Sequence, residues 1–170
     1  MLFRSDRPEA KEAYRVAARA AHGAGRLVSL SLSDSFCVDR HRDDFLGLVR
    51  DDVDIVFGNA DEVRSLYQVD SFDDAIEAVR GDCHLAAITN GEDGSVIVSD
   101  HEVIRVAADP VARVVDTTGA GDLYAAGFLY GLTTGRSLVE CGRLGSLAAA
   151  EVISHVGPRP LTELRRLVTF

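Results

Sequence analysis

Short apolar or alternating runs are interleaved with helical stretches along most of this chain, and this pattern constrains its fold more than any other feature. It predicts strands at 27–32, 54–57, 85–89, 95–98 and 103–106, and helices at 8–22, 38–50, 60–67, 71–80, 123–132 and 137–153, with a last short helix after Pro160. Strands connected through helices pair in parallel, because the helix carries the chain back across the sheet. The sequence therefore predicts an α/β fold with a mostly parallel sheet. No repeat or internal linker interrupts the pattern, so residues 1–170 are predicted to form a single domain.

The composition excludes several classes of protein. Apolar residues make up 46% of the chain and charged residues 26%, as in an ordinary globular protein. The net charge of −9 argues against nucleic acid as the main partner, because phosphate backbones attract basic faces. No apolar run approaches the roughly 20 residues that span a membrane, and the first residues are too polar for a signal peptide. With three scattered cysteines, which suit a reducing compartment, we expect a cytoplasmic protein without nucleic-acid or membrane partners.

The segment DTTGAGDLYAAGFLYGL, residues 116–132, holds the side chains most suited to chemistry. Gly119 and Gly121 flank an alanine just before an apolar helix, and residues 114–115 are predicted to end a strand. A glycine loop between a strand and a helix directs backbone N–H groups to a helix N-terminus, where they can hold an anion. Asp122, in the first helical turn, could then take a proton from a hydroxyl group while phosphoryl charge develops nearby.

Glycine-rich segments before a helix also occur in other settings, of which three bear on this chain. The glycines could only tighten a turn while Asp122 only caps the helix, and the residues by themselves leave this alternative open. A dinucleotide site is disfavoured, because G-x-G-x-x-G requires a glycine where this chain has Tyr124. A P-loop is excluded, because the single lysine of the chain, Lys11, has no glycine before it.

Taken whole, the segment resembles the C-terminal signature of the PfkB/ribokinase family of carbohydrate and nucleoside kinases, D-T-x-G-A-G-D followed by small residues and A-G-F. The resemblance implies a ribokinase-like fold, with a Rossmann-like, mostly parallel sheet and flanking helices. This chain would be the C-terminal, nucleotide-binding portion of that fold, without its β-sheet lid. The residues Ser29–Phe36 resemble an L-S-x-x-F stretch of adenosine kinases and favour that subgroup.

The resemblance also implies roles for residues of the signature. Asp122 would be the catalytic base that acts on the acceptor hydroxyl. The N–H groups of Gly119, Ala120 and Gly121 would form the anion hole for the transferring γ-phosphoryl group.

The same resemblance implies a cation site and part of the nucleotide site. Asp116 and the backbone at Thr118 would lie beside a monovalent cation such as K⁺, and Gly157 would complete that site. Ala149 and Ser154 would lie near the nucleotide, because small residues let a helix approach the adenine. The alternative is that the stretch 146–157 is a plain core helix.

Two upstream motifs follow the order of the family. Asn59 and Glu62 resemble an N-x-x-E motif that would organise Mg²⁺ and its waters, a task that suits hard oxygen ligands. Thr89, Gly91 and Gly94 resemble a T-x-G-x-x-G turn that would meet the phosphates and ribose of the nucleotide. Each has a plain alternative: the first could be a helix start with a solvated glutamate, and the second a turn that only joins strands.

These expectations combine into ATP-dependent transfer of the γ-phosphoryl group to a hydroxyl of an adenosine-like nucleoside or a sugar. ATP is then the co-substrate, Mg²⁺ its metal, and a small-molecule sugar or nucleoside the acceptor. The chain holds only about half of the extent that the resemblance implies, so we also expect an exposed strand edge or apolar face. A homodimer would belong to a full-length form. The alternative is a truncated nucleotide-binding remnant, or a regulatory partner, without transfer activity.

Overall fold

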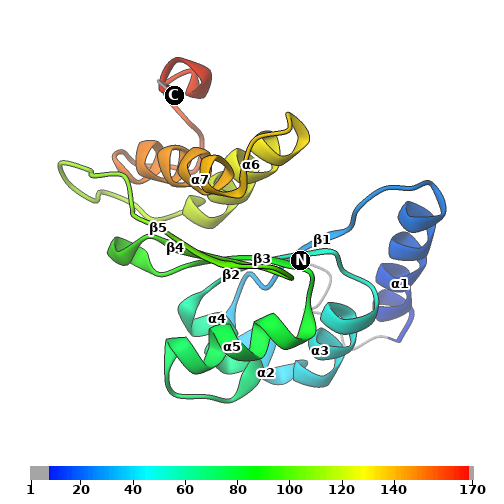
Figure 1. The fold of residues 1–170 in the computed structure, drawn as a ribbon. Coiled ribbons are helices and arrows are strands. Elements are labelled where there is room, and N and C mark those ends of the chain that lie inside the picture. Colours follow the sequence, from blue (N-terminus) through cyan, green and yellow to red (C-terminus); the bar gives the residue numbers. More distant parts are fainter. Residues whose placement is uncertain (1–7, 169–170) are drawn as a thin grey trace. The chain divides into compact units, whose positions relative to one another are not determined.

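The computed structural model describes residues 8–168 of the chain. Its strands form a five-stranded sheet in the order β1-β2-β3-β4-β5, so each strand lies beside its neighbour in the sequence. The sheet is mixed and mostly parallel with flanking helices, which confirms the predicted α/β class (Figure 1). The chain divides into two compact units, one of residues 8–88 with 98–102 and the other of residues 89–97 with 103–168.

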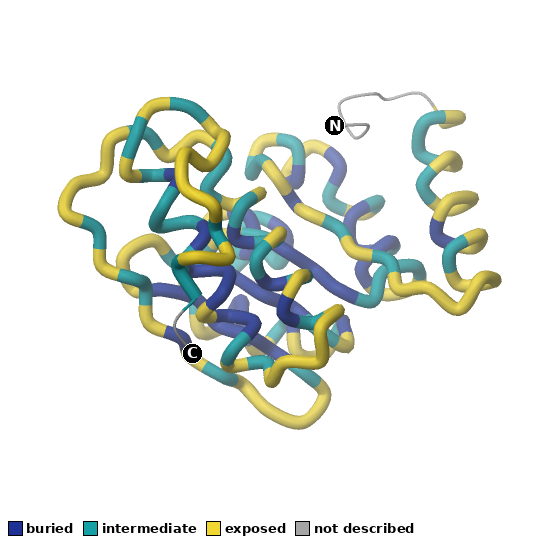
Figure 2. The backbone as a smooth tube through the Cα atoms, turned by 90° about the horizontal axis from the view of Figure 1, so that it is seen from above, coloured by how far each residue is buried: buried dark blue, intermediate teal, exposed yellow. Residues whose placement is uncertain are grey.

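The first unit contains the N-terminal strands and helices of the chain. Its elements are α1 (Pro8–Gly23), β1 (Ser29–Ser31), α2 (Ser35–Arg40), α3 (Arg42–Asp51), β2 (Ile55–Asn59), α4 (Ala60–Tyr67), α5 (Phe72–Asp82) and β3 (Leu85–Thr89). Strands β1 and β2 pair in parallel, with Leu30 opposite Val56. The interiors of β2 and β3 are buried, whereas Ser29 and Ser31 of β1 are exposed. Figure 2 shows the buried parts of the backbone in dark blue. Burial of these apolar residues drives the unit together.

Side chains that cap the helices explain why several predicted helices begin where they do. The Asn59 side chain accepts a hydrogen bond from the N–H of Glu62, and the Glu62 carboxylate accepts one from the N–H of Asn59. Ser71 accepts a hydrogen bond from the N–H of Asp74 at the start of α5. These side chains satisfy N–H groups that a helix start leaves without a partner.

Two predictions in the first unit were wrong in detail. The strand predicted at 27–32 is shorter, since β1 covers only Ser29–Ser31. The single helix predicted at 38–50 is two helices, because Asp34 caps an earlier start and the backbone leaves the helical region at His41. His41 has φ −119° and ψ 30° and separates α2 from α3.

The second unit contains two long helices that lie side by side. Its elements are a 3₁₀ turn at Gly91–Asp93, β4 (Ser95–Ser99), whose last residues fall in the first unit, β5 (Val103–Val106), α6 (Ala120–Thr133), α7 (Leu138–Ile153) and a 3₁₀ turn at Leu164–Arg166. Glycines let α6 and α7 approach closely, since an added Cβ on Gly145 would lie 2.8 Å from the carbonyl oxygen of Tyr124.

Two predictions in the second unit were also wrong. Val114 and Val115 do not end a strand. They lie in an exposed loop, where the N–H of Val115 donates to the carbonyl of Ile153 at the end of α7 rather than to a neighbouring strand. The short helix expected after Pro160 is only the 3₁₀ turn at Leu164–Arg166.

Two negative findings concern the described residues 8–168. None of their helices is long and apolar enough to cross a membrane. Within this range, Cys37, Cys83 and Cys141 form no disulfide bond.

Candidate active site

The glycine loop at 116–119 leads directly into α6. Gly119 is the N-cap residue and has φ 83°, in the left-handed region that glycine tolerates best. No side chain caps this helix start, so its N-terminal turn presents backbone rather than side-chain groups. The N–H of Ala120 donates to the carbonyl of Thr117 at 3.1 Å. Gly121 and Asp122 are exposed in the first turn of α6, where the helix dipole favours negative charge.

Asp116 is held by donors from two segments of the chain. Its Oδ1 accepts from the N–H of Thr118 at 2.9 Å and from the Thr118 hydroxyl at 2.6 Å. Its Oδ2 accepts from the N–H of Gly157 at 2.9 Å. The Thr118 hydroxyl, followed by the N–H of Gly157, lowers the pKa of Asp116 to about 2. The fold therefore brings together Asp116, Thr118 and Gly157, the residues predicted beside a cation, and keeps a charged carboxylate among them.

The C-terminal segment supports the same loop from another side. An added Cβ on Gly119 would lie only 2.8 Å from the Cβ of Pro158, so Pro158 packs against the N-cap of α6. The N–H of Val115 donates to the carbonyl of Ile153 at 2.8 Å. The loop before α6 is thus fixed by the residues that follow α7.

A cavity of about 650 Å³ opens in the second unit. This volume is in the usual range for small-molecule sites. Its lining includes six predicted site residues, Thr89, Gly91, Gly94, Ala120, Gly121 and Ala149. It also includes residues that were not predicted, among them Asp109, Tyr124, Ser146 and Ala150. Ser154 does not line it, and its hydroxyl donates to the carbonyl of Ala150 at 2.7 Å.

Tyr124 was not predicted as a site residue, and its only significance in the sequence is that it replaces the last glycine of a dinucleotide motif. Its hydroxyl donates to Ser95 Oγ at 2.8 Å, and both residues are buried. Burial raises the pKa of Tyr124 to about 12, so the hydroxyl keeps its proton. This bond ties the first turns of α6 to the strand that follows the Thr89–Gly94 turn. Only the fold reveals it, because the two residues are 29 positions apart.

The first unit contains the other predicted metal residues. Asn59 ends β2 and caps α4, and its Nδ2 donates to Glu62 Oε1 at 2.9 Å. Glu62 is buried rather than solvated, and burial raises the pKa of its carboxyl group. Both of its oxygens accept hydrogen bonds from Asn59, so the pair forms a helix start with an enclosed carboxylate. Among residues 8–168, no group of three or more His, Cys, Asp or Glu side chains is arranged to hold a metal ion.

Comparison with known proteins adds independent information. The family profile described as "pfkB family carbohydrate kinase" matches residues 6–164. A cytidine kinase of Thermococcus kodakarensis is 38% identical over 124 residues, which are 71% of this chain and 44% of that protein.

Solved structures are similar as well. An adenosine kinase from Sinorhizobium meliloti is 56% identical with a TM-score of 0.90, over 95% of this chain and 50% of that one. An aminoimidazole riboside kinase from Salmonella enterica is 25% identical with a TM-score of 0.83, over 99% of this chain and 60% of that one. The chain thus spans about half the length of the proteins that it matches.

Proposed function

Because the chain belongs to the pfkB family of carbohydrate kinases, we propose that it forms the nucleotide-binding half of an enzyme that phosphorylates a sugar or nucleoside with ATP. The two compact units would together be the C-terminal part of one kinase domain. One observation carries the proposal: the helix start at Gly119 has no side-chain cap, lies next to Asp122, and borders a cavity of the size a nucleotide needs.

The proposed chemistry uses the first turn of α6. Asp122 would accept the proton of the acceptor hydroxyl, and the exposed position of this carboxylate supports that role. The N–H groups of Gly119 and Gly121 would stabilise charge on the γ-phosphoryl oxygens. The N–H of Ala120, which donates to the Thr117 carbonyl, would donate to a γ-phosphoryl oxygen instead. Phosphoryl transfer depends mostly on positioning and charge stabilisation, which this arrangement would provide.

The cavity would hold the nucleotide. Thr89, Gly91 and Gly94 line one side of it and would meet the phosphates and ribose. Ala149 lines the cavity from α7, where its small side chain leaves room for the base. We propose an adenosine-like nucleoside as the acceptor, since the adenosine kinase from Sinorhizobium meliloti is 56% identical to this chain.

We propose sites for two cations. Asp116 supplies a charged carboxylate, and with the backbone at Thr118 and Gly157 it would hold a monovalent cation such as K⁺. Glu62 and Asn59 supply hard oxygen donors and would act on Mg²⁺ through its waters. When bound, Mg²⁺ neutralises negative charge on the phosphates.

The test is nucleotide binding and phosphoryl transfer by the purified chain. We expect calorimetric binding of ATP with Mg²⁺, and transfer to adenosine if the acceptor contacts within these residues suffice. Asp122→Asn should abolish transfer and leave ATP affinity within a factor of about two, because the carboxylate acts on the acceptor.

The matched control is Asp74→Asn, which changes another exposed aspartate in the first turn of a helix. It should behave as the wild type. Near-normal turnover in Asp122→Asn would contradict the proposed base, and failure of the wild type to bind ATP would contradict the function as a whole.

The half-length match favours one second candidate, a nucleotide-binding module that binds ATP without transferring its phosphate. The same experiment separates the two. Binding of ATP with no transfer to adenosine, cytidine or ribose would support the module.

A further inference from the structure

Glu151 is a half-buried acidic residue near the C-terminal end of α7, where the helix dipole disfavours negative charge. Its side chain is only 9% exposed. One oxygen accepts the N–H groups of Leu161 at 2.9 Å and Thr162 at 2.8 Å, and the other lies 3.3 Å from Nε2 of His155. Burial opposes the charge, but these donors together hold the pKa of Glu151 below its ordinary value. The carboxylate is therefore stabilised by the segment that follows its own helix.

That segment has little regular structure of its own. Residues 154–163 contain no helix or strand. The bonds from Glu151 to Leu161 and Thr162 close a loop of about ten residues and fix its far end against α7. A segment without a backbone ladder depends on such side-chain bonds for its position.

The middle of the same segment supports the loop before α6. The N–H of Gly157 donates to Asp116, and Pro158 packs against Gly119. Any movement of residues 157–158 would remove a donor from Asp116 and open space behind the N-cap of α6. Glu151 itself does not line the cavity, and its side-chain hydrogen bonds go to residues 155, 161 and 162 rather than to Asp116, so the segment links it to the loop.

We propose that Glu151 is a positioning residue for phosphate binding. By fixing residues 155–162, it sets Gly157 and Pro158 against the glycine loop and holds the start of α6 in the shape that receives the phosphate chain. The inference rests on the proposed function, because it concerns the same site.

The proposal predicts a selective loss. Glu151→Ala should weaken binding of a non-hydrolysable ATP analogue with Mg²⁺ by about tenfold, while binding of AMP should change less than about twofold. The reason is that the glycine loop would contact the outer phosphates, whereas the base and ribose would bind elsewhere in the cavity. Calorimetry on the full chain gives both dissociation constants, and their ratio is the readout.

Glu140→Ala is the matched control. Glu140 lies on the same helix and accepts comparable bonds from Ser137 and Arg136, but at the opposite end of α7. It should lower the unfolding temperature without changing the ratio of the two dissociation constants. The same outcome in Glu151→Ala would show a purely structural residue and would overturn the proposal.

Two further measurements keep the test decisive. If Glu151→Ala does not fold, Glu151→Asp withdraws the carboxylate by one methylene and should change the ratio in the same direction. Amide hydrogen exchange at Gly157 should accelerate in the Glu151 variant and not in Glu140→Ala, a result that needs no nucleotide. Unaltered amide exchange at Gly157 in the Glu151 variant would contradict the positioning role of Glu151 but not the proposed function. A wild type that binds no ATP would contradict the proposed function and, with it, the positioning role.

Discussion

Asp116 receives three hydrogen bonds, two from Thr118 and one from Gly157, which is 41 positions away. The donors stabilise the charged form of the carboxylate in the folded chain, and the pKa of Asp116 is therefore about 2 instead of 3.8. By linkage, the folded state gains stability from this group wherever the group is charged in both states. This contribution is complete at pH values above the pKa of Asp116 in the unfolded chain. It disappears as the pH falls through the pKa of Asp116 in the folded chain.

We predict a difference in acid sensitivity between the wild type and Asp116→Asn. As the pH falls from 3.8 to about 2, the unfolding temperature of the wild type should decrease more steeply than that of the variant, which has no charge to lose at this position. Thermal unfolding followed by circular dichroism at several pH values measures both. Parallel curves would show that these donors do not stabilise the Asp116 charge.

The sequence could predict Asp116, Thr118 and Gly157 as one set only through the family resemblance, because their contact depends on how the C-terminal segment folds back. Glu151 and Tyr124 were not predicted as parts of the site. Apart from His155, four positions from Glu151, their partners lie 10 to 29 positions away, and no local pattern links Tyr124 to Ser95 or Glu151 to Thr162. Residue type and spacing thus pointed to residues of the cavity lining and the glycine loop, but not to the side chains that hold them in place.

The two glycines at the start of α6 differ in backbone conformation and in surroundings. Gly119 has φ 83° and packs against Pro158, whereas Gly121 has helical neighbours and nothing within 4 Å of an added Cβ. A Cβ is strained in the left-handed region, but alanine is favoured over glycine inside a helix.

We therefore predict stability changes of opposite sign. Gly119→Ala should lower the free energy of unfolding by at least about 1–2 kcal/mol. Gly121→Ala should raise it by about 0.5–1 kcal/mol. Urea unfolding of both variants measures the two changes, and each serves as the control for the other. An unchanged free energy of unfolding in Gly119→Ala would mean that Gly119 does not need its left-handed conformation, and a loss in Gly121→Ala would contradict the helical position of Gly121.

The sequence predicted the starts of α4 and α5 accurately, because a capping side chain precedes each of them. The predicted helix 60–67 matches α4, which begins with a reciprocal Asn59–Glu62 cap, and Ser71 begins α5 as expected. The break at His41 was missed because the pattern on both sides is helical, and only the backbone shows the interruption. The loop at Val114 and Val115 was missed because its hydrogen-bond partner is the end of α7, a tertiary contact that no local pattern encodes.

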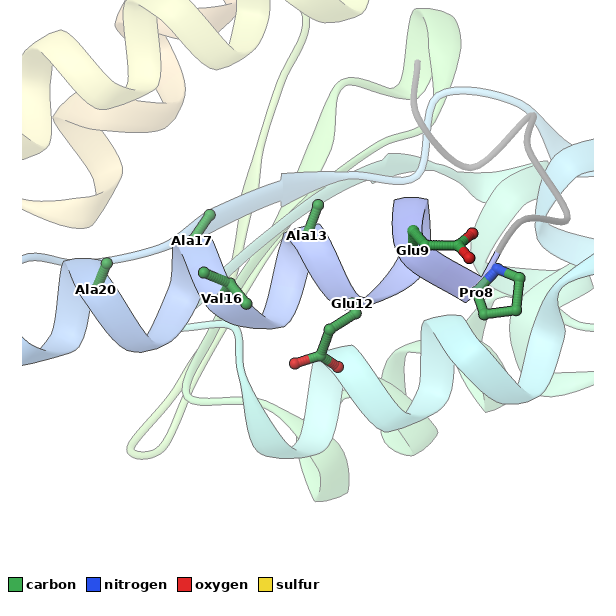
Figure 3. A pocket seen from close by; sticks show the side chains of 7 residues that line it. All are labelled: Pro8, Glu9, Glu12, Ala13, Val16, Ala17 and Ala20. Atoms are coloured by element: carbon green, nitrogen blue, oxygen red, sulfur yellow. The ribbon is translucent and has the colours of Figure 1, made fainter.

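The first unit has an amphipathic helix whose apolar side is turned outward. On one side of α1, Lys11 pairs with Asp44 at 2.6 Å and His22 with Asp54 at 2.9 Å. The opposite side presents an apolar stripe that lines a shallow hollow (Figure 3), formed by Ala13, Val16, Ala17 and Ala20. Among residues 8–168, β1 ends the strand order and pairs with β2, and no other strand lies along its second edge. The unit thus has an edge strand and an exposed apolar stripe, and their cover by further strands stays a prediction.

An open strand edge and an apolar stripe in the same unit favour association between chains, because pairing and burial would satisfy both. We predict that the purified chain associates with itself as its concentration rises, and that Val16→Glu shifts it toward the monomer by placing a charge in the stripe, where Val16 is 52% exposed. Sedimentation velocity measures the distribution. The matched control is Val139→Glu, which changes a valine of similar accessibility, 45% exposed, on a helix of the second unit. If the wild type and both variants sediment as monomers at every concentration, the stripe and the strand edge do not drive association. If both variants move toward the monomer equally, the added glutamate acts through the net charge of the chain rather than through α1.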